Sequence, residues 1–405
     1  MKFAHIADCH IGSWRDPKLA DLSTKAFTKT VDTCIKENVD FVLISGDLFN
    51  TSLPSIDRLK EVTKKLKQLK DNNINVYAIA GSHDFSPSGK TMLDVIENAG
   101  LLVNVVRGEA NNNKLKLNFT IDPKTGAKIT GMLGKKGMLE KNYYEALDKK
   151  NLEAEEGYKI FMFHTALTEF KPEEMEKMES TPLSFLPKGF NYYAGGHVHY
   201  IFNKKEKGYG TIAYPGALFP NNFSELQKYG HGGFYIIEDE EIRYVPIKLH
   251  DTTNIEIDCE HKTPEKIEKE LMHEITKHEL KNKIVMIKLS GTIESGIISD
   301  IHFNEAFDKA YEKDAYFVMK NTNQLKTREL EQIRVDTTNT EETEDKLIKE
   351  HLGQIKLEGM DAEEEEKLTR QLMKTLNSEK QEGERNIDFE NRLLKELKHS
   401  LRLID

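Results

Sequence analysis

The most informative residues are two potential metal ligands near the start of the chain. Asp8 and His10 stand two residues apart directly after the apolar run 3–7, with Cys9 between them. Carboxylate oxygens and imidazole nitrogens together suit divalent metals of the manganese, iron or zinc type. Alone the pair is weak evidence, because Asp and His also end strands as turn-forming or capping residues.

Four further polar clusters follow short apolar runs in the same way. They are Asp47 after 41–45, Ser82 and His83 after 75–80, His164 after 160–163, and His197 and His199 after 192–196. Open α/β sheets place their ligands at the carboxyl ends of the strands, so we expect these side chains to converge on one crevice. Two carboxylates and several imidazoles suit two metals that share one carboxylate. Such a metal pair activates a water molecule and neutralises phosphoryl oxygens.

The elements that must position these residues alternate between strands and helices. Apolar residues at helical spacing predict helices over 19–38, 54–69 and 90–98, between strands at 3–7, 41–45, 75–80 and 101–106. This order predicts a largely parallel sheet that is covered by helices. After a hairpin signal at 122–126, a strand-rich stretch completes a first domain over residues 1–250.

The rest of the chain carries no comparable cluster of ligands. Strand and helix patterns alternate from 252 to 320 and predict a small α/β domain over 251–322. The remainder, 323–405, is rich in Thr, Glu and Lys, and its acidic run 363–366 is typical of a solvated face or a linker. A final helix gathers Phe389, Leu393, Leu397, Leu401 and Ile404 in one apolar stripe. An isolated stripe of this kind favours docking on a partner, with packing on its own domain as the alternative.

The acidity of the chain lies in its second part. Residues 1–250 carry 33 Lys and Arg against 32 Asp and Glu, whereas residues 251–405 carry 25 against 36. Net charge therefore neither favours nor excludes nucleic-acid binding, which would need a local patch. Three widely spaced cysteines imply no disulfide framework. No segment approaches the about 18–20 apolar residues of a membrane span, so we expect a cytoplasmic protein.

Taken together, the five clusters resemble the pattern of the calcineurin-like metallophosphoesterases: D-x-H, G-D, G-N-H-[DE], H and G-H-x-H. Within that superfamily, residues 5–10 (HIADCH) and 46–49 (GDLF) and the long chain beyond them resemble one branch. It is the nuclease subunit of the double-strand-break-repair complex, the meiotic recombination eleven and SbcD family. The resemblance implies a four-layer α/β sandwich, with two sheets flanked by helices. It also implies a small α/β capping domain over 251–322 and a helical partner-binding segment within 323–405.

The resemblance also implies a role for each cluster. Asp8, His10 and His199 would bind one Mn²⁺, Asp47 would bridge two, and His164 and His197, with Ser82 beside them, would bind the second. His83 would protonate the leaving oxygen or stabilise the phosphorane, since the alkoxide of a diester is a poor leaving group. The implied activity is manganese-dependent 3′ to 5′ exonuclease and single-strand endonuclease cleavage of DNA. The implied assembly is a nucleoid-associated homodimer, joined through the helices after the first two motifs, with an SMC-like Rad-fifty ATPase as partner.

Two positions depart from the family pattern. Ser82 stands where the family usually has Asn, and Asn50 stands where it often has a second His. An amide oxygen reaches a metal directly, whereas we expect a hydroxyl on a shorter arm to reach it only through a bridging water. We therefore hypothesise that the second metal is held more weakly in this chain.

Other functions fit parts of the pattern. Each cluster taken singly is a common turn former or a structural histidine, but independent turn residues would not reproduce this order. A small-nucleotide phosphodiesterase of the same fold leaves residues 251–405 without a purpose. Protein phosphatases of the fold carry an Arg after Gly-Asp, where this chain has Thr51, Ser52 and Leu53. A non-catalytic scaffold would need no metal and would be insensitive to changes at His83.

Overall fold

The computed structural model describes residues 1–86, 89–111, 114–135, 141–327, 362–376, 378 and 386–401. These residues belong to two compact units, 1–327 and 328–405, and each is considered by itself. The first unit contains all five clusters that the sequence singles out.

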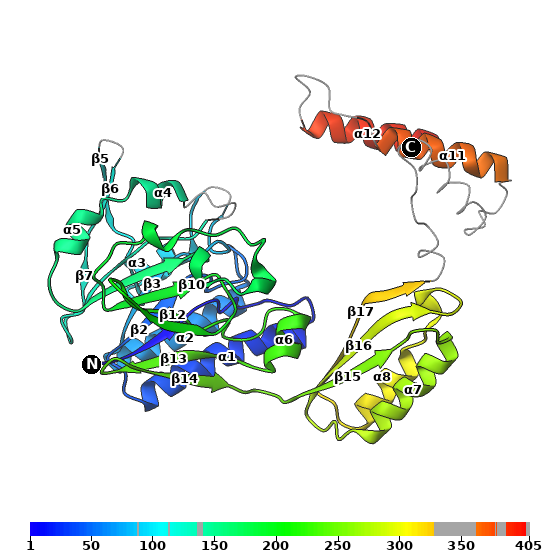
Figure 1. Cartoon of the computed structure of the whole chain (residues 1–405), viewed down its shortest axis with the longest axis horizontal. Coiled ribbons are helices and arrows are strands. Elements are labelled where there is room, and N and C mark those ends of the chain that lie inside the picture. Colours follow the sequence, from blue (N-terminus) through cyan, green and yellow to red (C-terminus); the bar gives the residue numbers. More distant parts are fainter. Residues whose placement is uncertain are drawn as a thin grey trace. The chain divides into compact units, whose positions relative to one another are not determined.

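The first unit is built on two six-stranded sheets (Figure 1). In one sheet, four parallel strands are flanked by an antiparallel hairpin on one side, in the order β14 (Glu241–Ile247), β13 (Gly232–Glu238), β1 (Lys2–Ile6), β2 (Phe41–Ser45), β3 (Asn75–Ile79) and β4 (Val103–Asn104). The order of the other is β11 (Phe202–Glu206), β12 (Gly210–Tyr214), β10 (Tyr192–Gly196), β9 (Lys159–His164), β8 (Lys128–Gly131) and β7 (Thr120–Ile121). Its inner four strands are parallel, and β11 and β7 are antiparallel to their neighbours.

The two sheets pack face to face, and helices cover their outer faces. Alternate residues of a strand point to opposite faces, so Phe3 joins an apolar layer with Ile160 and Tyr192 while Ala4 joins the core on the helical side. Helices α1 (Pro17–Lys36), α2 (Ile56–Asp71), α3 (Met92–Asn98) and α6 (Phe223–Tyr229) contribute to that core. Helices α4 (Lys141–Ala146) and α5 (Lys149–Ala154), with the hairpin β5 (Gly108–Asn111) and β6 (Lys114–Leu117), lie by the second sheet. The four-layer sandwich is thus confirmed.

A smaller α/β element completes the first unit. Its three parallel strands, β15 (Thr252–Asp258), β16 (Ile284–Ile293) and β17 (Phe317–Thr327), pack with α7 (Pro264–Lys277) and α8 (Asn304–Glu312) around a core of their own. Ile284 and Met286 on β16 also join the core of the first sheet and its helices. The division into domains at 250 and 322 remains a proposal, which this separate core supports.

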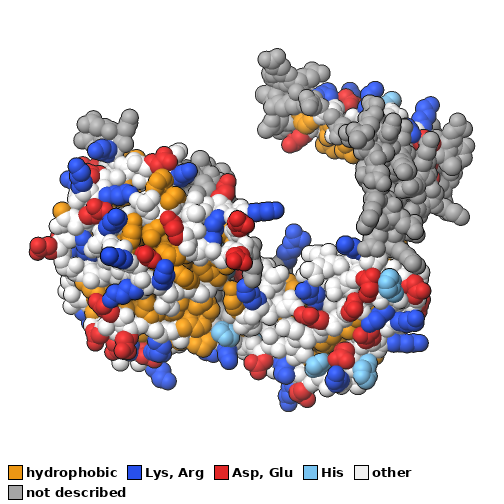
Figure 2. Space-filling model, in the orientation of Figure 1, with side chains coloured by type: hydrophobic (Ala, Val, Ile, Leu, Met, Phe, Trp, Pro, Cys, Tyr) orange, Lys and Arg blue, Asp and Glu red, His pale blue; other side chains and the backbone are white. Residues whose placement is uncertain are grey.

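The described part of residues 328–405 consists mainly of two helices. Helix α11 (Ala362–Leu376) and helix α12 (Asn386–Ser400) each carry apolar side chains on one side, and some of these are visible in Figure 2. Leu376, Leu394 and Leu401 are exposed. None of the helices described is long and apolar enough to cross a membrane.

A few elements differ from their sequence patterns. The strand predicted over 101–106 has only two paired residues, in β4, and the first sheet has an antiparallel edge. The whole acidic run 363–366 lies on helix α11, whose existence the run of glutamates concealed. Ile404, the last residue of the predicted stripe, lies outside the described residues.

Candidate metal centre

The five clusters meet where neighbouring strands of both sheets end. Strands β1, β2 and β3 are adjacent in the first sheet, and β9 and β10 are adjacent in the second. Three sets of ligand atoms lie within 4.8 Å of one another: Asp8, His10 and His199; Asp8, Asp47 and His164; and His10, Asp47 and His83. Residues up to 191 positions apart are thereby brought together, as the strand-end pattern predicts.

The backbone at this site adopts an unusual conformation. Asp8, His10, Asp47 and His197 have φ angles of 48°, 40°, 51° and 87°. Non-glycine residues with positive φ are uncommon, and each strained position costs on the order of 1–3 kcal/mol that the surrounding structure must offset. Backbone hydrogen bonds hold the turns, since the Asp8 N–H donates to Gly46 O (3.2 Å) and the His10 N–H donates to Asp47 O (3.0 Å). Strain concentrated on potential ligands indicates a functional site.

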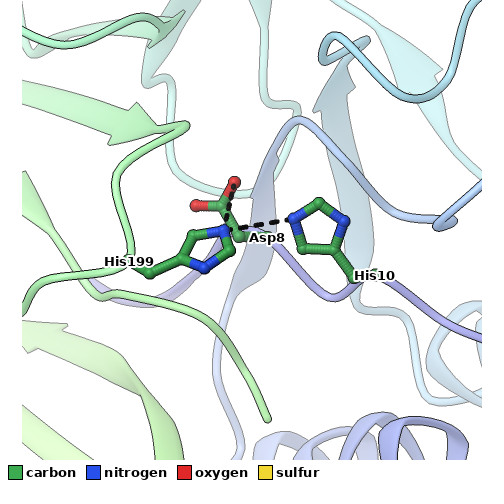
Figure 3. A group of neighbouring side chains, drawn as sticks. All are labelled: Asp8, His10 and His199. Atoms are coloured by element: carbon green, nitrogen blue, oxygen red, sulfur yellow. Dashed lines mark hydrogen bonds and ion pairs between the residues drawn. The ribbon is translucent and has the colours of Figure 1, made fainter. Parts of the chain in front are cut away.

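The first set of ligands surrounds a point between two sheets (Figure 3). Nε2 of His10 lies 3.2 Å from Nε2 of His199, which lies 4.0 Å from Oδ1 of Asp8. The backbone N–H of His197 donates to both Asp8 oxygens, at 3.0 and 3.1 Å. Burial raises the pKa of Asp8 to about 6 and lowers the pKa of His10 to about 3. Burial thus disfavours the charged form of each residue. A bound cation would have the opposite effect on Asp8, because it would favour the ionised carboxylate.

The second set shows most directly that a cation fits. Nδ1 of His164 lies 2.8 Å from the carbonyl oxygen of Ser45, which can only accept, so this nitrogen carries a proton. In the neutral ring, Nε2 then presents a lone pair to Oδ2 of Asp47, 3.2 Å away, and has no hydrogen-bond partner. Two buried acceptors that face each other need a proton or a metal between them. Burial lowers the pKa of His164, but the Asp47 carboxylate outweighs this effect and raises it to about 10.

Asp47 belongs to two of the three sets, one with Asp8 and His164 and the other with His10 and His83. Burial opposes its ionisation, but His164, His10 and the backbone N–H of His83 together hold its pKa well below its usual range. That N–H lies 2.7 Å from Oδ1 of Asp47, and the Ser82 hydroxyl lies 3.5 Å from Oδ2. An ionised carboxylate in the middle of the site suits the bridging position between two cations.

His83 faces the site from its rim. Its Nδ1–H donates to the carbonyl oxygen of Asn50 (3.0 Å), which leaves Nε2 as the ring nitrogen available to a substrate. The ring packs edge-on against His10 with 4.9 Å between centroids. Asn50, which stands where the family often has a second His, thus contacts His83 through its backbone carbonyl and not through its side chain.

His197 and Cys9 are placed less directly. The imidazole of His197 is absent from the three sets above, although its ring lies 5.3 Å from that of His164. Burial, with a further contribution from His164, lowers the pKa of His197 to about 4, so its ring is neutral near pH 7. Cys9 is buried and belongs to the apolar core on the helical side of the first sheet.

Sequence reasoning missed two carboxylates that support the ligands. Glu225, on α6, accepts a hydrogen bond from Nδ1 of His199 (2.9 Å). The buried Asp84 accepts from the backbone N–H groups of Gly81 (2.9 Å) and Phe49 (3.3 Å), and so ties two of the site loops together. The spacing Asn222-x-x-Glu225 was the available signal for Glu225, but it indicates only a helix start.

His5, a buried histidine on β1, also supports the site from within the sandwich. It contacts the hydroxyl groups of Tyr192 (2.9 Å) and Ser45 (3.0 Å), and Ser45 carries the carbonyl that anchors His164. Burial lowers the pKa of His5 to about 3, so it stays neutral. Two carboxylates, anchored imidazoles and orphaned acceptors together support a site for two metals.

Comparisons with known proteins agree with this arrangement. Residues 1–200 match the family model described as calcineurin-like phosphoesterase. The chain is 28% identical to the DNA double-strand break repair protein Mre11 of Archaeoglobus fulgidus, over 72% of this chain and 69% of that protein. It is 28% identical to the Methanopyrus kandleri Mre11, over 59% and 54% of the two chains. It is 30% identical to that of Methanocaldococcus jannaschii, over 64% and 67%.

Proposed function

The chain belongs to the calcineurin-like phosphoesterase family of metal-dependent enzymes, and from that premise we propose that it is a manganese-dependent DNA nuclease. It would act as a 3′ to 5′ exonuclease and a single-strand endonuclease in double-strand-break repair. The observation that carries the proposal is the pair of buried carboxylates, Asp8 and Asp47, ringed by imidazoles, of which His164 and His199 have their outer nitrogens already anchored. The likeness to Mre11 proteins extends over 316 residues, beyond the phosphoesterase match at 1–200.

Each residue of the site then has a proposed task. Asp8, His10 and His199 would hold one cation, Asp47 would be shared, and His164, His197 and Ser82 would face the other. Two bound cations would supply an activated water and neutralise charge on the phosphoryl oxygens. With both ring nitrogens protonated, His83 would give its Nε2 proton to the leaving 3′ or 5′ oxygen and become neutral, while its Nδ1–H stays on the Asn50 carbonyl.

The test uses end-labelled duplex DNA with Mn²⁺, with and without a chelator, beside a small diester substrate. We expect stepwise loss of label that the chelator abolishes. Intact DNA with continued hydrolysis of the small diester would replace the proposal with a small-nucleotide phosphodiesterase. No hydrolysis of either substrate in the presence of bound metal would leave a subunit that needs its ATPase partner for activity, or a scaffold.

We predict that Ser82→Asn tightens the weaker metal. The Ser82 hydroxyl is 3.5 Å from Asp47 Oδ2, and the longer amide would bring a carbonyl oxygen to the same cation. A roughly tenfold gain in affinity, about 1.4 kcal/mol, is expected for the second Mn²⁺ alone, measured by calorimetric titration. Ser55→Asn, an exposed change before α2, serves as the control. Two equal and tight Mn²⁺ sites in the unaltered protein would contradict the prediction.

The proposed partners are DNA, a second copy of the chain, and an SMC-like ATPase of the Rad-fifty type. On the face shown in Figure 2, Lys and Arg side chains are interspersed with Asp and Glu, so DNA contacts would depend on local groups there. The exposed side chains of Leu394 and Leu401 on and after α12 support docking of this helix on a coiled coil. The protein would accordingly be associated with the nucleoid.

The homodimer can be tested at the start of α2. Leu53 and Ile56 are 75% and 83% exposed, an unfavourable position for large apolar side chains unless a second copy covers them. We predict that Ile56→Glu produces a monomer with nearly unchanged stability, measured by analytical ultracentrifugation and urea unfolding. Ile121→Glu, at a comparably exposed position (58%) in β7, should leave the dimer intact. A dimer that survives Ile56→Glu would place the contact elsewhere.

A further inference from the structure

We propose that Glu225 is a positioning residue of the metal centre: it fixes the ring of His199 so that Nε2 is unprotonated and faces Asp8 and His10. This role rests on the proposed function, because it concerns the same two-metal site. Glu225 belongs to none of the five clusters and lies 26 residues beyond His199 in the chain.

The hydrogen bonds around the carboxylate determine which imidazole nitrogen carries the proton. Oε1 of Glu225 lies 2.9 Å from Nδ1 of His199 and accepts from the Asn222 side-chain amide (2.5 Å). Oε2 accepts from the backbone N–H of Asn221 (2.8 Å). An ionised carboxylate can only accept, so Nδ1 of His199 is the donor. In the neutral ring the lone pair is then on Nε2.

The local sequence builds this carboxylate into a rigid helix start. Asn222 is the N-cap of α6, and its side chain accepts from the backbone N–H of Glu225. Glu225 bonds back to the two residues before the helix, so its side chain has little freedom to swing away. The side chain is only 19% exposed.

The direction of the fixed ring matters because the site is crowded. Nε2 of His199 is 3.2 Å from Nε2 of His10, so a flipped ring or the other tautomer would present a proton where a lone pair is needed. His164 has the corresponding anchor in the Ser45 carbonyl. A carboxylate fixes the tautomer of its imidazole as a carbonyl does, and it also makes the imidazole a stronger base. Loss of such a partner typically lowers metal affinity by about 10–100-fold.

The test is the Mn²⁺ binding isotherm of the full chain, followed by electron paramagnetic resonance of free Mn²⁺. We expect Glu225→Ala to weaken one of the two bound ions by about 10–100-fold and to leave the other within about threefold. Glu225→Gln keeps an oxygen that can accept from His199, so it should recover part of the lost affinity. Gly230→Ala strains the left-handed C-cap at the other end of the same helix (φ +68°), away from Glu225 in the first turn, and should stay within about threefold of the unaltered protein.

The outcomes separate this role from helix capping and from the proposed function. Equal weakening of both ions by Glu225→Ala, or an equal loss in Gly230→Ala, would show that α6 acts only by its stability and would overturn the positioning role. Unchanged binding in Glu225→Ala would also overturn it. If the unaltered protein binds two Mn²⁺ and cleaves no DNA, the proposed function fails while the role of Glu225 can still be measured.

Discussion

Replacing His83 by Ala should slow cleavage of DNA at least 100-fold while the protein still binds two Mn²⁺. The expected size follows from the contribution of a positioned general acid, about 10²–10⁴-fold in rate. The structure supports this role because the Asn50 carbonyl takes the Nδ1–H of His83, so that Nε2 is the nitrogen that can give up a proton from the doubly protonated ring. The measurement is the rate of release of label from duplex DNA at saturating Mn²⁺, with the metal content determined in parallel.

A change of leaving group makes this prediction sharper. A nitrophenyl diester expels a stable phenolate that needs no proton, so His83→Ala should affect its hydrolysis far less than it affects DNA. His261→Ala, an exposed histidine change in the small α/β element, is the matched control and should alter neither rate. His83 also forms a set with His10 and Asp47, so loss of one Mn²⁺ in His83→Ala would identify it as a ligand and contradict the proton-donor role.

The convergence of the five clusters could be predicted because it depends on strand order and direction alone. Each cluster follows a short apolar run, and parallel strands that neighbour one another end on the same edge. The alternation of strands and helices therefore predicts that Asp8, Asp47 and Ser82 lie at one edge of a sheet, and their strands are indeed adjacent. That a second sheet brings His164 and His199 to the same place followed from the family resemblance.

What could not be predicted depends on contacts between loops. Asp84 and Glu225 each complete hydrogen bonds to backbone or imidazole groups that the sequence does not place beside them. The positive φ of Asp8, His10 and Asp47 is equally hidden, because Asp and His adopt it more often than most residues but far less readily than Gly. Helix α11 was hidden for a different reason, since a run of like charges suits a solvated helix face as well as a linker.

The strained ligands and the glycines around them form one tightly packed unit. A Cβ on Gly81 would lie 2.3 Å from Oδ1 of Asp47, and one on Gly134 would lie 2.5 Å from the His164 ring. These positions have no flexible neighbour that could give way without moving a ligand. Close packing of this kind offsets the backbone strain and holds the carboxylates near each other before any metal binds.

Gly196→Ala is therefore expected to damage stability and metal binding together. Its Cβ would lie 2.0 Å from the Ser45 carbonyl oxygen and 2.8 Å from Nδ1 of His164, the two groups joined by the anchoring hydrogen bond. Because β2 and β10 belong to different sheets, relief requires the sheets to part locally, at a cost of about 3 kcal/mol, the upper end of ordinary overpacking. Freed from Ser45, His164 should lose its fixed tautomer, and Mn²⁺ affinity should fall about 10–100-fold.

Urea unfolding and a Mn²⁺ titration measure the two effects of Gly196→Ala separately. Gly208→Ala is the control, because its Cβ meets nothing within 4 Å, although its φ of +83° is left-handed. That conformation alone should cost about 1–2 kcal/mol and leave metal binding unchanged. If Gly196→Ala resembles Gly208→Ala in both measurements, the Ser45 carbonyl does not govern His164. If metal affinity falls in Gly196→Ala but not in Gly208→Ala, the contact between the two sheets is what prepares the site for its second cation.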